Sequence, residues 1–270
     1  MTAEQFQKLT KHIERLAFWE SVPGLPDAKG VWHVHPIKFI EHLAKCMWLS
    51  KNELARIYPT APSGNAATIS HGTPEAVREK YRVEINKCCI KYGLNTRMRM
   101  AHFFGQGAVE SMSLNRMLED QDGSKYEWSE QLGNISQGDG KKFKGRGIKQ
   151  LTGRFNYGEY WAFRGWLKKG IDFDPGWETP ETKEKPSNPP KRPPLIDNPD
   201  RILETVYNCV DGGVWYSVLF RSSTAAAMDR DDVRAVTHAV NGGKDTPKWE
   251  KNSSLRDRIN HTQRIKKVLL

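Results

Sequence analysis

The chain has 270 residues, and its 42 Lys and Arg residues exceed its 32 Asp and Glu residues, which gives a net charge of +10. Hydrophobic residues make up 37% of the chain and nine residues are Trp, a composition that excludes a disordered polyelectrolyte. No run of about 18 apolar residues is present, so the sequence predicts no membrane-spanning helix. A chain of this length can bury one large hydrophobic core or two smaller ones.

The first residues lack the order of a secretory signal, because Glu4, Lys8 and Glu14 interrupt the apolar stretches. The cysteines are too few for a disulfide scaffold, and no CxxC pair or suitably spaced His accompanies them. We therefore expect no metal, no cofactor, and a protein made in the cytoplasm without a signal peptide. We expect the four cysteines to be buried as small hydrophobic residues: Cys46, Cys88, Cys89 and Cys209.

Helical periodicity dominates the start of the chain. Apolar residues at three- and four-residue steps predict helices over 3–17 and 38–48. Ser50 and Glu53 then form the pattern of a capping box, which opens a short helix that ends near Pro59.

Two longer helices follow. Thr73 with Pro74 is typical of a helix start, and the helical pattern continues to Gly93. Asn95 or Thr96 caps the next helix, in which several small residues allow another backbone to approach closely. These small residues are Gly105, Gly107 and Ala108.

The second half of the chain contains a proline-rich stretch over 174–199, with eight of the 15 prolines. Such a stretch cannot form the interior of a helix or sheet, and we interpret it as an inserted loop. Helical patterns resume over 200–220, 231–240 and 253–270. The sequence therefore predicts a mainly α protein.

Two carboxylates are candidates for acid–base chemistry. Glu110 lies among apolar and small residues, where the loss of solvation favours a protonated carboxyl. Glu119 lies nine residues on, beside Asp120, in a more polar setting. One protonated and one ionised carboxyl are what glycoside hydrolysis requires. On one uninterrupted helix the two would be about 13 Å apart on opposite faces, so the helix should end soon after Ser111 if they cooperate.

Glycine turns and polar side chains are concentrated in residues 138–157. Gly145 and Gly147 allow the backbone to come close to a ligand or a strand. The stretch is not a phosphate-binding loop, because the GxxxxGK[ST] pattern is absent. If this stretch is extended, one of its faces carries Gln150, Thr152 and Asn156. These side chains are suited to hydrogen bonds with sugar hydroxyl and N-acetyl groups.

The same region carries the densest positive charge. Cations interleaved with aromatic residues are typical of a nucleic-acid surface, although a solvated loop beside a polar site fits equally well. No nucleic-acid motif accompanies them, and the overall charge also suits an anionic membrane or cell-wall polymer. The cations are Lys141, Lys142, Lys144, Arg146, Lys149 and Arg154.

The run Gly145-Arg-Gly-Ile-Lys-Gln-Leu-Thr-Gly-Arg-Phe-Asn-Tyr157 resembles the GRGxxQLTGRxNY signature of glycoside hydrolase family 19, in its bacterial and phage endolysin branch. Upstream, the segment from Arg97 to Ser111 resembles the family's helix that ends in His-Glu-Ser. The resemblance extends over about residues 75–265. It implies a lysozyme-like helical fold with a cleft and at most a small β element.

The resemblance also implies roles for individual residues. Glu110 corresponds to the general acid, and Glu119 to the base that activates water. Thr152 would help to hold that water, and Arg146 and Arg258 would orient the carboxylates. The sugar would be bound by Gln150, Asn156 and Asn241.

The chain departs from the family pattern at Val109, where the family usually has His. This change leaves open a different substrate or a weakened enzyme. The N-terminal 60–70 residues, with Trp32-His-Val-His-Pro36, resemble leaders of peptidoglycan hydrolases that type VI secretion delivers. Release of a phage lysin through a holin would explain the missing signal equally well.

We therefore expect a helical leader or subdomain over 1–70 and a lysozyme-like domain over 71–270. The predicted function is cleavage of β-1,4 bonds in peptidoglycan by inversion, in a monomer that acts in the periplasm or cell wall of a target cell. An immunity protein or a secretion component is an expected partner; nucleic acid and membrane insertion are not. The alternatives are a chitinase, a glycan-binding module with weakened catalysis, and a nucleic-acid binder.

Overall fold

The structure is a computed structural model that describes residues 2–16, 37, 47–59, 72–178, 191–241 and 253–270. The chain divides into two compact units, residues 1–44 and 45–270. The described part of the first unit contains α1 (Ala3–Leu16), as the periodicity predicts. The helix predicted over 38–48 lies, except for its last two residues, outside the described residues.

The second unit is built from helices. Isolated β-bridges join Leu118 to Arg146 and Arg146 to Leu151, so the β structure here is small and the predicted mainly α class is confirmed. No described helix is long and apolar enough to cross a membrane. The main helices are α3 (Lys51–Ile57), α4 (Pro74–Lys91), α5 (Arg97–Glu110), α6 (Asp139–Lys142), α7 (Arg154–Phe163), α8 (Val206–Val214), α9 (Ser223–Asp229), α10 (Val233–Asn241) and α12 (Ser253–Leu269).

Local sequence signals set the helix starts. The capping box of α3 forms as predicted, because the Ser50 side chain accepts from the Glu53 amide and Glu53 binds back to the Ser50 amide. Thr73 caps α4 with Pro74 in its first turn, and Thr96 caps α5 by accepting from Arg99 N at 3.2 Å.

The domain boundary lies earlier than residue 70. Helix α3 packs against α4 and α12, and its Leu54 and Ile57 are fully buried in the larger hydrophobic core. Tyr58 is also buried and donates a hydrogen bond to the Phe104 carbonyl at 2.9 Å. The α3 segment, which the sequence analysis placed in the leader, is therefore part of the second unit because its apolar face completes that core.

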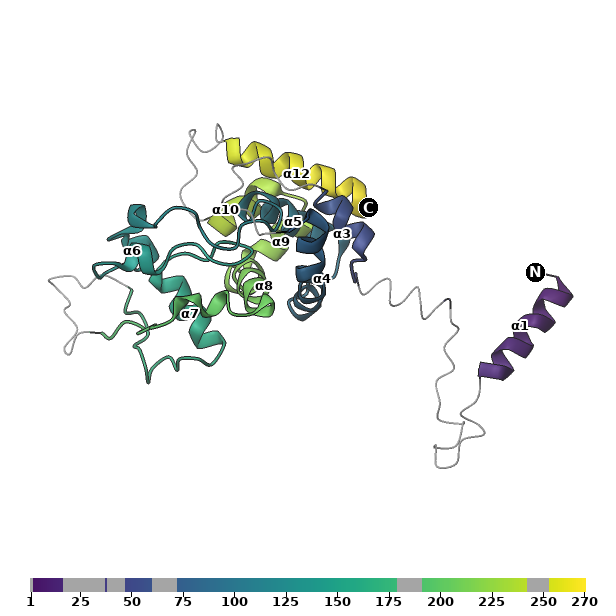
Figure 1. Cartoon of the computed structure of the whole chain (residues 1–270), viewed down its shortest axis with the longest axis horizontal. Helices are drawn as coiled ribbons and strands as arrows, with labels where there is room; N and C mark the ends of the chain where they lie inside the picture. The colour runs from purple at the N-terminus through teal and green to yellow at the C-terminus, as the bar shows by residue number, and fades with distance from the viewer. Residues whose placement is uncertain (1, 17–36, 38–46, 60–71, 179–190, 242–252) are drawn as a thin grey trace, which may run out of the picture. The chain divides into compact units, whose positions relative to one another are not determined.

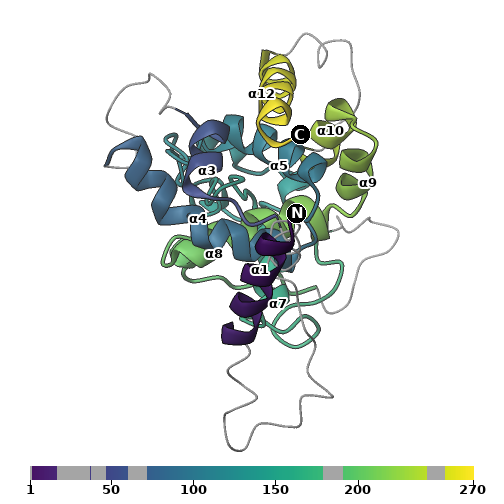
Figure 2. The same ribbon diagram turned by 90° about the vertical axis from the view of Figure 1, so that its right-hand side faces the viewer.

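Helix α12 packs along α5 at one edge of the second unit, with α9 and α10 on one side of this pair and α3 and α4 on the other (Figures 1 and 2). The predicted close approach occurs at Gly105, where an added Cβ would lie 2.1 Å from Thr262 Oγ1. At Gly107 an added Cβ would lie 2.7 Å from the Tyr58 hydroxyl oxygen. The two glycines therefore allow α12 and Tyr58 to reach the α5 backbone.

A second, aromatic core surrounds α7, and the proline-rich insertion attaches beside it. The two described flanks of the insertion bind each other, since the Asp174 amide donates to the Arg192 carbonyl and the side chains pair at 2.8 Å. Pro194 accepts a hydrogen bond from Arg154 of α7 at 3.0 Å. The insertion thus leaves and re-enters the domain at one place, as expected of a loop.

The helix predicted over 200–220 is interrupted. A 3₁₀ turn over Pro199–Ile202 precedes α8, and a π-helix over Trp215–Phe220 follows it. The Thr205 hydroxyl accepts from the Asn208 amide at 3.0 Å and starts α8 as a separate helix. A hydrophobic pattern of constant period could not distinguish these three geometries.

We expect Gly105→Ala to lower the free energy of unfolding by about 1–3 kcal/mol, because the added methyl group overpacks the contact between α5 and α12. Urea denaturation would measure the loss. In a Thr262→Gly background the loss should shrink, since the Thr262 side chain supplies the contact at 2.1 Å. Equal stability of Gly105→Ala and the parent would contradict the close packing.

Candidate active site

Glu110 is the last residue of α5, and Ser111 caps the helix end, so the helix ends where cooperation with Glu119 requires. The Glu110 Oε1 atom accepts a hydrogen bond from Arg258 Nη2 at 2.6 Å. The Glu110 side chain is 19% exposed, and that of Arg258 is 4% exposed. The acid candidate therefore lies against a buried cation, and its setting is less apolar than its sequence neighbours suggest.

Arg258 belongs to α12 and is fixed by more than its ion pair. Its Nη1 donates to Gln106 Oε1 at 2.5 Å, and its Nε donates to Ser254 Oγ at 3.2 Å. Gln106 in turn donates to Thr237 Oγ1 of α10 at 2.9 Å. The predicted contact between Arg258 and a carboxylate is present. Gln106 was not predicted, and only its position one turn before Glu110 could have suggested it.

Glu119 lies outside the helices, on a segment that runs beside Gly145. Its Oε2 accepts from the Gly145 amide at 3.0 Å, and its Oε1 accepts from the Tyr126 hydroxyl at 3.0 Å. The Lys125 ammonium lies 2.9 Å from the same Oε1 atom. Lys125 and Tyr126 were not predicted from the sequence, because no motif marks them.

These contacts determine the ionisation of Glu119. Burial raises the pKa of this carboxyl, but the hydrogen bonds from the Gly145 amide, Lys125 and Tyr126 outweigh burial and lower the pKa below 4.5. Glu119 is therefore ionised at neutral pH, which is the state that a general base requires.

The turn from Gly145 to Leu151 brings the two carboxylate segments together. The Gly147 amide donates to the Met117 carbonyl at 2.7 Å, which fixes the segment leading to Glu119. A Cβ at Gly145 would lie 3.2 Å from Glu119 Oε2, so glycine leaves space for the carboxylate. The predicted close approach at this glycine is to a side chain of the protein itself.

Lys149, in the same turn, reaches the helix that carries Glu110. The Lys149 side chain is buried, and its ammonium donates to the Phe103 carbonyl of α5 at 3.0 Å. Burial lowers the pKa of Lys149 well below 10.5, while the charge of Glu110 raises it and that of Arg258 lowers it further. The turn therefore contacts both carboxylate segments, one through backbone amides and the other through a buried amine.

The chain between the two carboxylates has an unusual backbone. Met112, Ser113 and Leu114 have φ angles of 46°, 56° and 76°, so three consecutive residues other than glycine are left-handed. Each such residue costs roughly 1–2 kcal/mol. The Ser111 hydroxyl stabilises this turn by accepting from the Leu114 amide at 3.2 Å.

Arg146 is buried and does not contact either carboxylate through its guanidinium. Its Nε donates to Asp200 Oδ1 at 2.6 Å, and its Nη1 donates to the Tyr157 hydroxyl at 3.0 Å. Nη1 also donates to the Lys142 and Lys144 carbonyls. This differs from the expected role, because the guanidinium organises the loop around it, while the backbone of its neighbour Gly145 orients Glu119.

The predicted sugar-binding residues are not on one extended face. The backbone of Gln150 is left-handed, with φ of 52°. Its side-chain amide donates to the Gly147 and Arg116 carbonyls. Asn156 lies in α7 and donates to the Thr152 carbonyl at 2.7 Å. Asn241 is exposed at the end of α10. A tight turn and a helix replace the expected strand.

The basic stretch is also different from an exposed cationic surface. Arg146, Lys149 and Arg154 are buried, and Arg154 forms a bidentate ion pair with Asp139 at 2.5 and 2.9 Å. Half of the six cations therefore serve the interior of the domain, which removes most of the support for the nucleic-acid interpretation. Lys141 is exposed, and Lys142 and Lys144 are half-buried.

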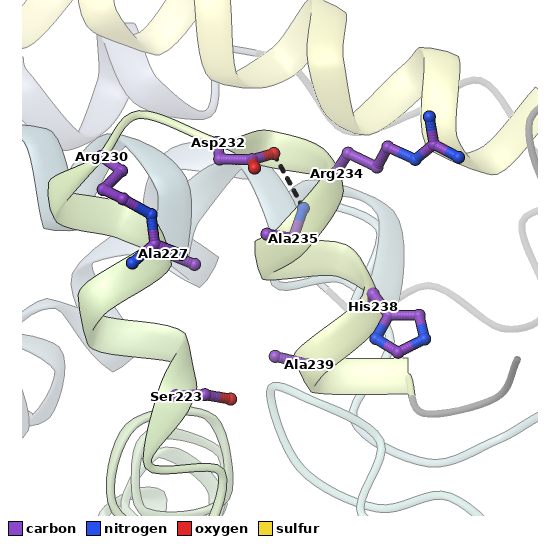
Figure 3. Close-up of a pocket in the computed structure, with 8 residues that line it drawn as sticks. All are labelled: Ser223, Ala227, Arg230, Asp232, Arg234, Ala235, His238 and Ala239. Carbon is purple, nitrogen blue, oxygen red and sulfur yellow. Dashed lines mark hydrogen bonds between the residues drawn. The ribbon is translucent and has the colours of Figure 1, made fainter. Parts of the chain in front are cut away.

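A separate recess of about 340 Å³ lies between α9 and α10 (Figure 3). Asp232 at its edge accepts from the Ala235 amide at 2.9 Å and so begins α10, and the lining includes Arg230 and His238. This recess contains neither Glu110 nor Glu119. Among the described residues, no group of three or more His, Cys, Asp or Glu side chains could hold a metal ion.

We expect Lys149→Met to stabilise the domain at neutral pH. The pKa of Lys149 is lower in the folded protein than in the unfolded chain. As the pH falls below about 10.5, the unfolded chain therefore binds a proton at Lys149 that the folded protein does not bind, and the free energy of unfolding decreases. Replacing the amine with an apolar side chain of similar length removes this loss, so the free energy of unfolding at pH 7 should rise.

Urea denaturation at pH 7 and pH 10 would test this, with Lys142→Met as the control. The increase in the free energy of unfolding caused by Lys149→Met should be smaller at pH 10, because fewer unfolded chains bind a proton at Lys149 there. A variant that is less stable than the parent at both pH values would mean that the hydrogen bond to Phe103 matters more than burial of the amine.

No family model matches the chain. Among solved structures, the chain is similar to a family GH19, class IV chitinase from Zea mays, with 12% identity, a TM-score of 0.54, and coverage of 83% of this chain and 93% of the chitinase. It also matches a mutant of chitinase C, with 15% identity, a TM-score of 0.48, and coverage of 82% and 92%. Chitinase C from Streptomyces griseus matches at 15% identity with a TM-score of 0.45, over 82% and 76% of the two chains. At the identity of the maize enzyme the likeness concerns the fold alone: the chain has the mainly α, lysozyme-like fold of a family 19 chitinase.

Proposed function

We propose that the protein is a glycoside hydrolase that cleaves the β-1,4 bonds of peptidoglycan with inversion. The observation that carries this proposal is the contrast between the two carboxylates. Glu110 ends a helix beside the buried Arg258, whereas Glu119 is kept ionised by an amide, a phenol and an ammonium group. Two carboxyl groups in unlike environments can divide the acid and base roles.

In this mechanism Glu110 protonates the leaving oxygen. Arg258 binds Oε1, so Oε2 is the atom that carries the proton, and the same guanidinium stabilises the carboxylate that remains after transfer. Glu119 removes a proton from a water molecule on the opposite face of the sugar. Gly145 and Tyr126 keep Glu119 in its reactive state and orient both of its oxygens.

Asn156 is our strongest candidate for a contact with the sugar. Its Oδ1 atom is buried and has no hydrogen-bond partner among the described residues, while its Nδ2 is bound to Thr152. An acceptor without a partner is costly to bury, and an N-acetyl N–H or a sugar hydroxyl would satisfy it once a local movement exposes the atom. Thr152 remains the candidate that helps to hold the water, and Gln150 and Asn241 remain candidates for sugar binding.

The net charge of +10 favours an anionic wall polymer over neutral chitin. Lys141, Lys142 and Lys144 keep some exposure and can contribute to that attraction. The competing proposal is a chitinase, which the fold similarity to the maize class IV chitinase favours. Both proposals use the same two carboxylates and differ in the groups attached to the sugar.

The sequence supports a further proposal about delivery. The leader-like N-terminal residues suggest that a type VI secretion system or a holin brings the enzyme to the wall of a target cell. A producing cell would then need an immunity protein against its own enzyme. Protection by a co-expressed neighbouring protein would support this proposal.

Incubation with purified sacculi should release muropeptides, and mass spectrometry of their reducing ends should identify the bond that is cut. Glu110→Gln should reduce the rate at least about 100-fold, because the leaving group loses its proton donor, while binding to sacculi persists. Inversion would be visible by NMR of the anomeric proton. Unchanged sacculi beside hydrolysed chitin oligomers would favour the chitinase.

Tyr126→Phe tests the role of Glu119. Removing the hydroxyl removes one hydrogen bond that lowers the pKa of Glu119, so the pKa should rise. Because the base is active only when ionised, the acidic limb of kcat/KM against pH should move to higher pH by up to about one unit. Tyr207→Phe, which alters a phenol bonded to Lys91 instead, is the matched control. Identical profiles for the two variants would exclude Tyr126 as a partner of the base.

A further inference from the structure

Trp128 combines two features that each destabilise the folded chain. Its side chain is 60% exposed, and its φ angle is 58°, in the left-handed region. Among the described residues its indole makes no hydrogen bond and no ring contact, whereas Trp161, Trp166 and Trp215 belong to the aromatic core. A single exposed aromatic residue is ordinary, but one on a strained backbone is not.

The strain has a specific origin. Residues 126–129 form a turn in which the Ser129 amide donates to the Tyr126 carbonyl at 3.2 Å. Glu127, with φ of −61° and ψ of 134°, occupies the first central position of a type II turn, and Trp128 occupies the second. That second position favours glycine, so the fold alone gives no reason for a bulky residue there.

The turn is firmly attached to the base side of the candidate active site. The Tyr126 hydroxyl donates to Glu119 Oε1 at 3.0 Å, and the Tyr126 carbonyl accepts from Asn134 Nδ2 at 2.8 Å. The Glu127 carboxylate accepts from the amides of Gly138 and Gly140. Trp128 is two residues from Tyr126, so its Cα lies within about 7.6 Å of the Tyr126 Cα. The backbone that carries Trp128 is therefore held close to Tyr126, the residue that binds Glu119.

We propose that Trp128 is a stacking platform for a pyranose ring of the glycan, at a subsite beside Glu119. The apolar face of an N-acetylhexosamine is the complement of an exposed indole, and a tryptophan offers a large contact area with few rotatable bonds. This inference rests on the proposed function and names a residue that binds its substrate.

Isothermal titration in a Glu110→Gln background, which blocks turnover, is the test. The probes are the hexamer of N-acetylglucosamine and soluble peptidoglycan glycan strands without peptides. Trp128→Ala should raise Kd for the preferred probe at least about tenfold, as expected for loss of a central tryptophan contact. Trp128→Phe should recover much of the affinity. Trp48→Ala removes another exposed tryptophan, which is 46% exposed and precedes Leu49, a residue bound to Asn86 of α4, and it should leave Kd unchanged.

Thermal melting distinguishes the effect of losing the indole ring from the effect of backbone strain at residue 128. Trp128→Gly should melt about 2 °C or more above Trp128→Ala, because glycine tolerates the left-handed angle, while both variants should bind equally weakly. Unchanged Kd in Trp128→Ala, with binding intact in the background, would overturn the stacking role and leave the proposed function standing. Absence of binding in the background together with absence of hydrolysis by the unaltered enzyme would overturn both.

Discussion

The tight turn from Gly145 to Leu151 is the constraint on which the candidate active site depends. It binds the Glu119 carboxylate through the Gly145 amide and α5 through the Lys149 ammonium. Its Ile148 amide also donates to the Cys209 carbonyl at 3.0 Å, which attaches it to α8. One short segment thus sets where the acid-bearing helix and the base-bearing segment lie relative to the second half of the domain.

This arrangement explains why glycines recur in the turn. At Gly147, with φ of 77°, an added Cβ would lie 2.8 Å from the Cys209 carbonyl, so the contact with α8 requires glycine. At Gly145 an added Cβ would lie 2.9 Å from Gln150 Oε1 and 3.2 Å from Glu119 Oε2. Both glycines are therefore needed for contacts within the protein, and a sugar contact is not required to account for them.

Charge is distributed between the interior and the surface in a way that composition does not reveal. Arg258 and Arg154 are buried, and each forms an ion pair with one carboxylate at 2.5–2.6 Å. A buried ion pair contributes little net stability but is very costly to break, so it fixes geometry more than it adds to the free energy of unfolding. Because each of these pairs is neutral, neither contributes to the net charge of +10, which comes from the other charged residues of the chain.

The sequence predicted features that depend on local chemistry. The caps at Ser50, Thr73 and Thr96 follow from side chains that bind amides within one turn, and they form as expected. The geometry that two cooperating carboxylates impose predicted a helix end soon after Ser111, and α5 ends at Glu110. Hydrophobic period alone also identified the helical class.

Features that depend on tertiary contacts were not predictable in the same way. An arginine in a glycine-rich motif could face a carboxylate or the loop, and only the fold reveals that Arg146 binds Asp200 and Tyr157. Likewise Lys125 and Tyr126 reach Glu119 because the chain folds back after Gly123, which has φ of 87°. The resemblance to family 19 supplied Glu119 as a candidate, but not the groups that keep it ionised.

Backbone strain is concentrated around the two carboxylates. Among the described residues other than glycine that have positive φ, most lie between Glu110 and Asn156: Met112, Ser113, Leu114, Trp128 and Gln150. Such residues persist only where surrounding contacts fix them, and they gather at functional sites. Such contacts are made by the Ser111 hydroxyl, by the Glu127 carboxylate and by the side-chain amide of Gln150. Stability is thus lowered in the one region where carboxylate position matters most, and the rigid helices α5 and α12 supply the framework that tolerates the loss.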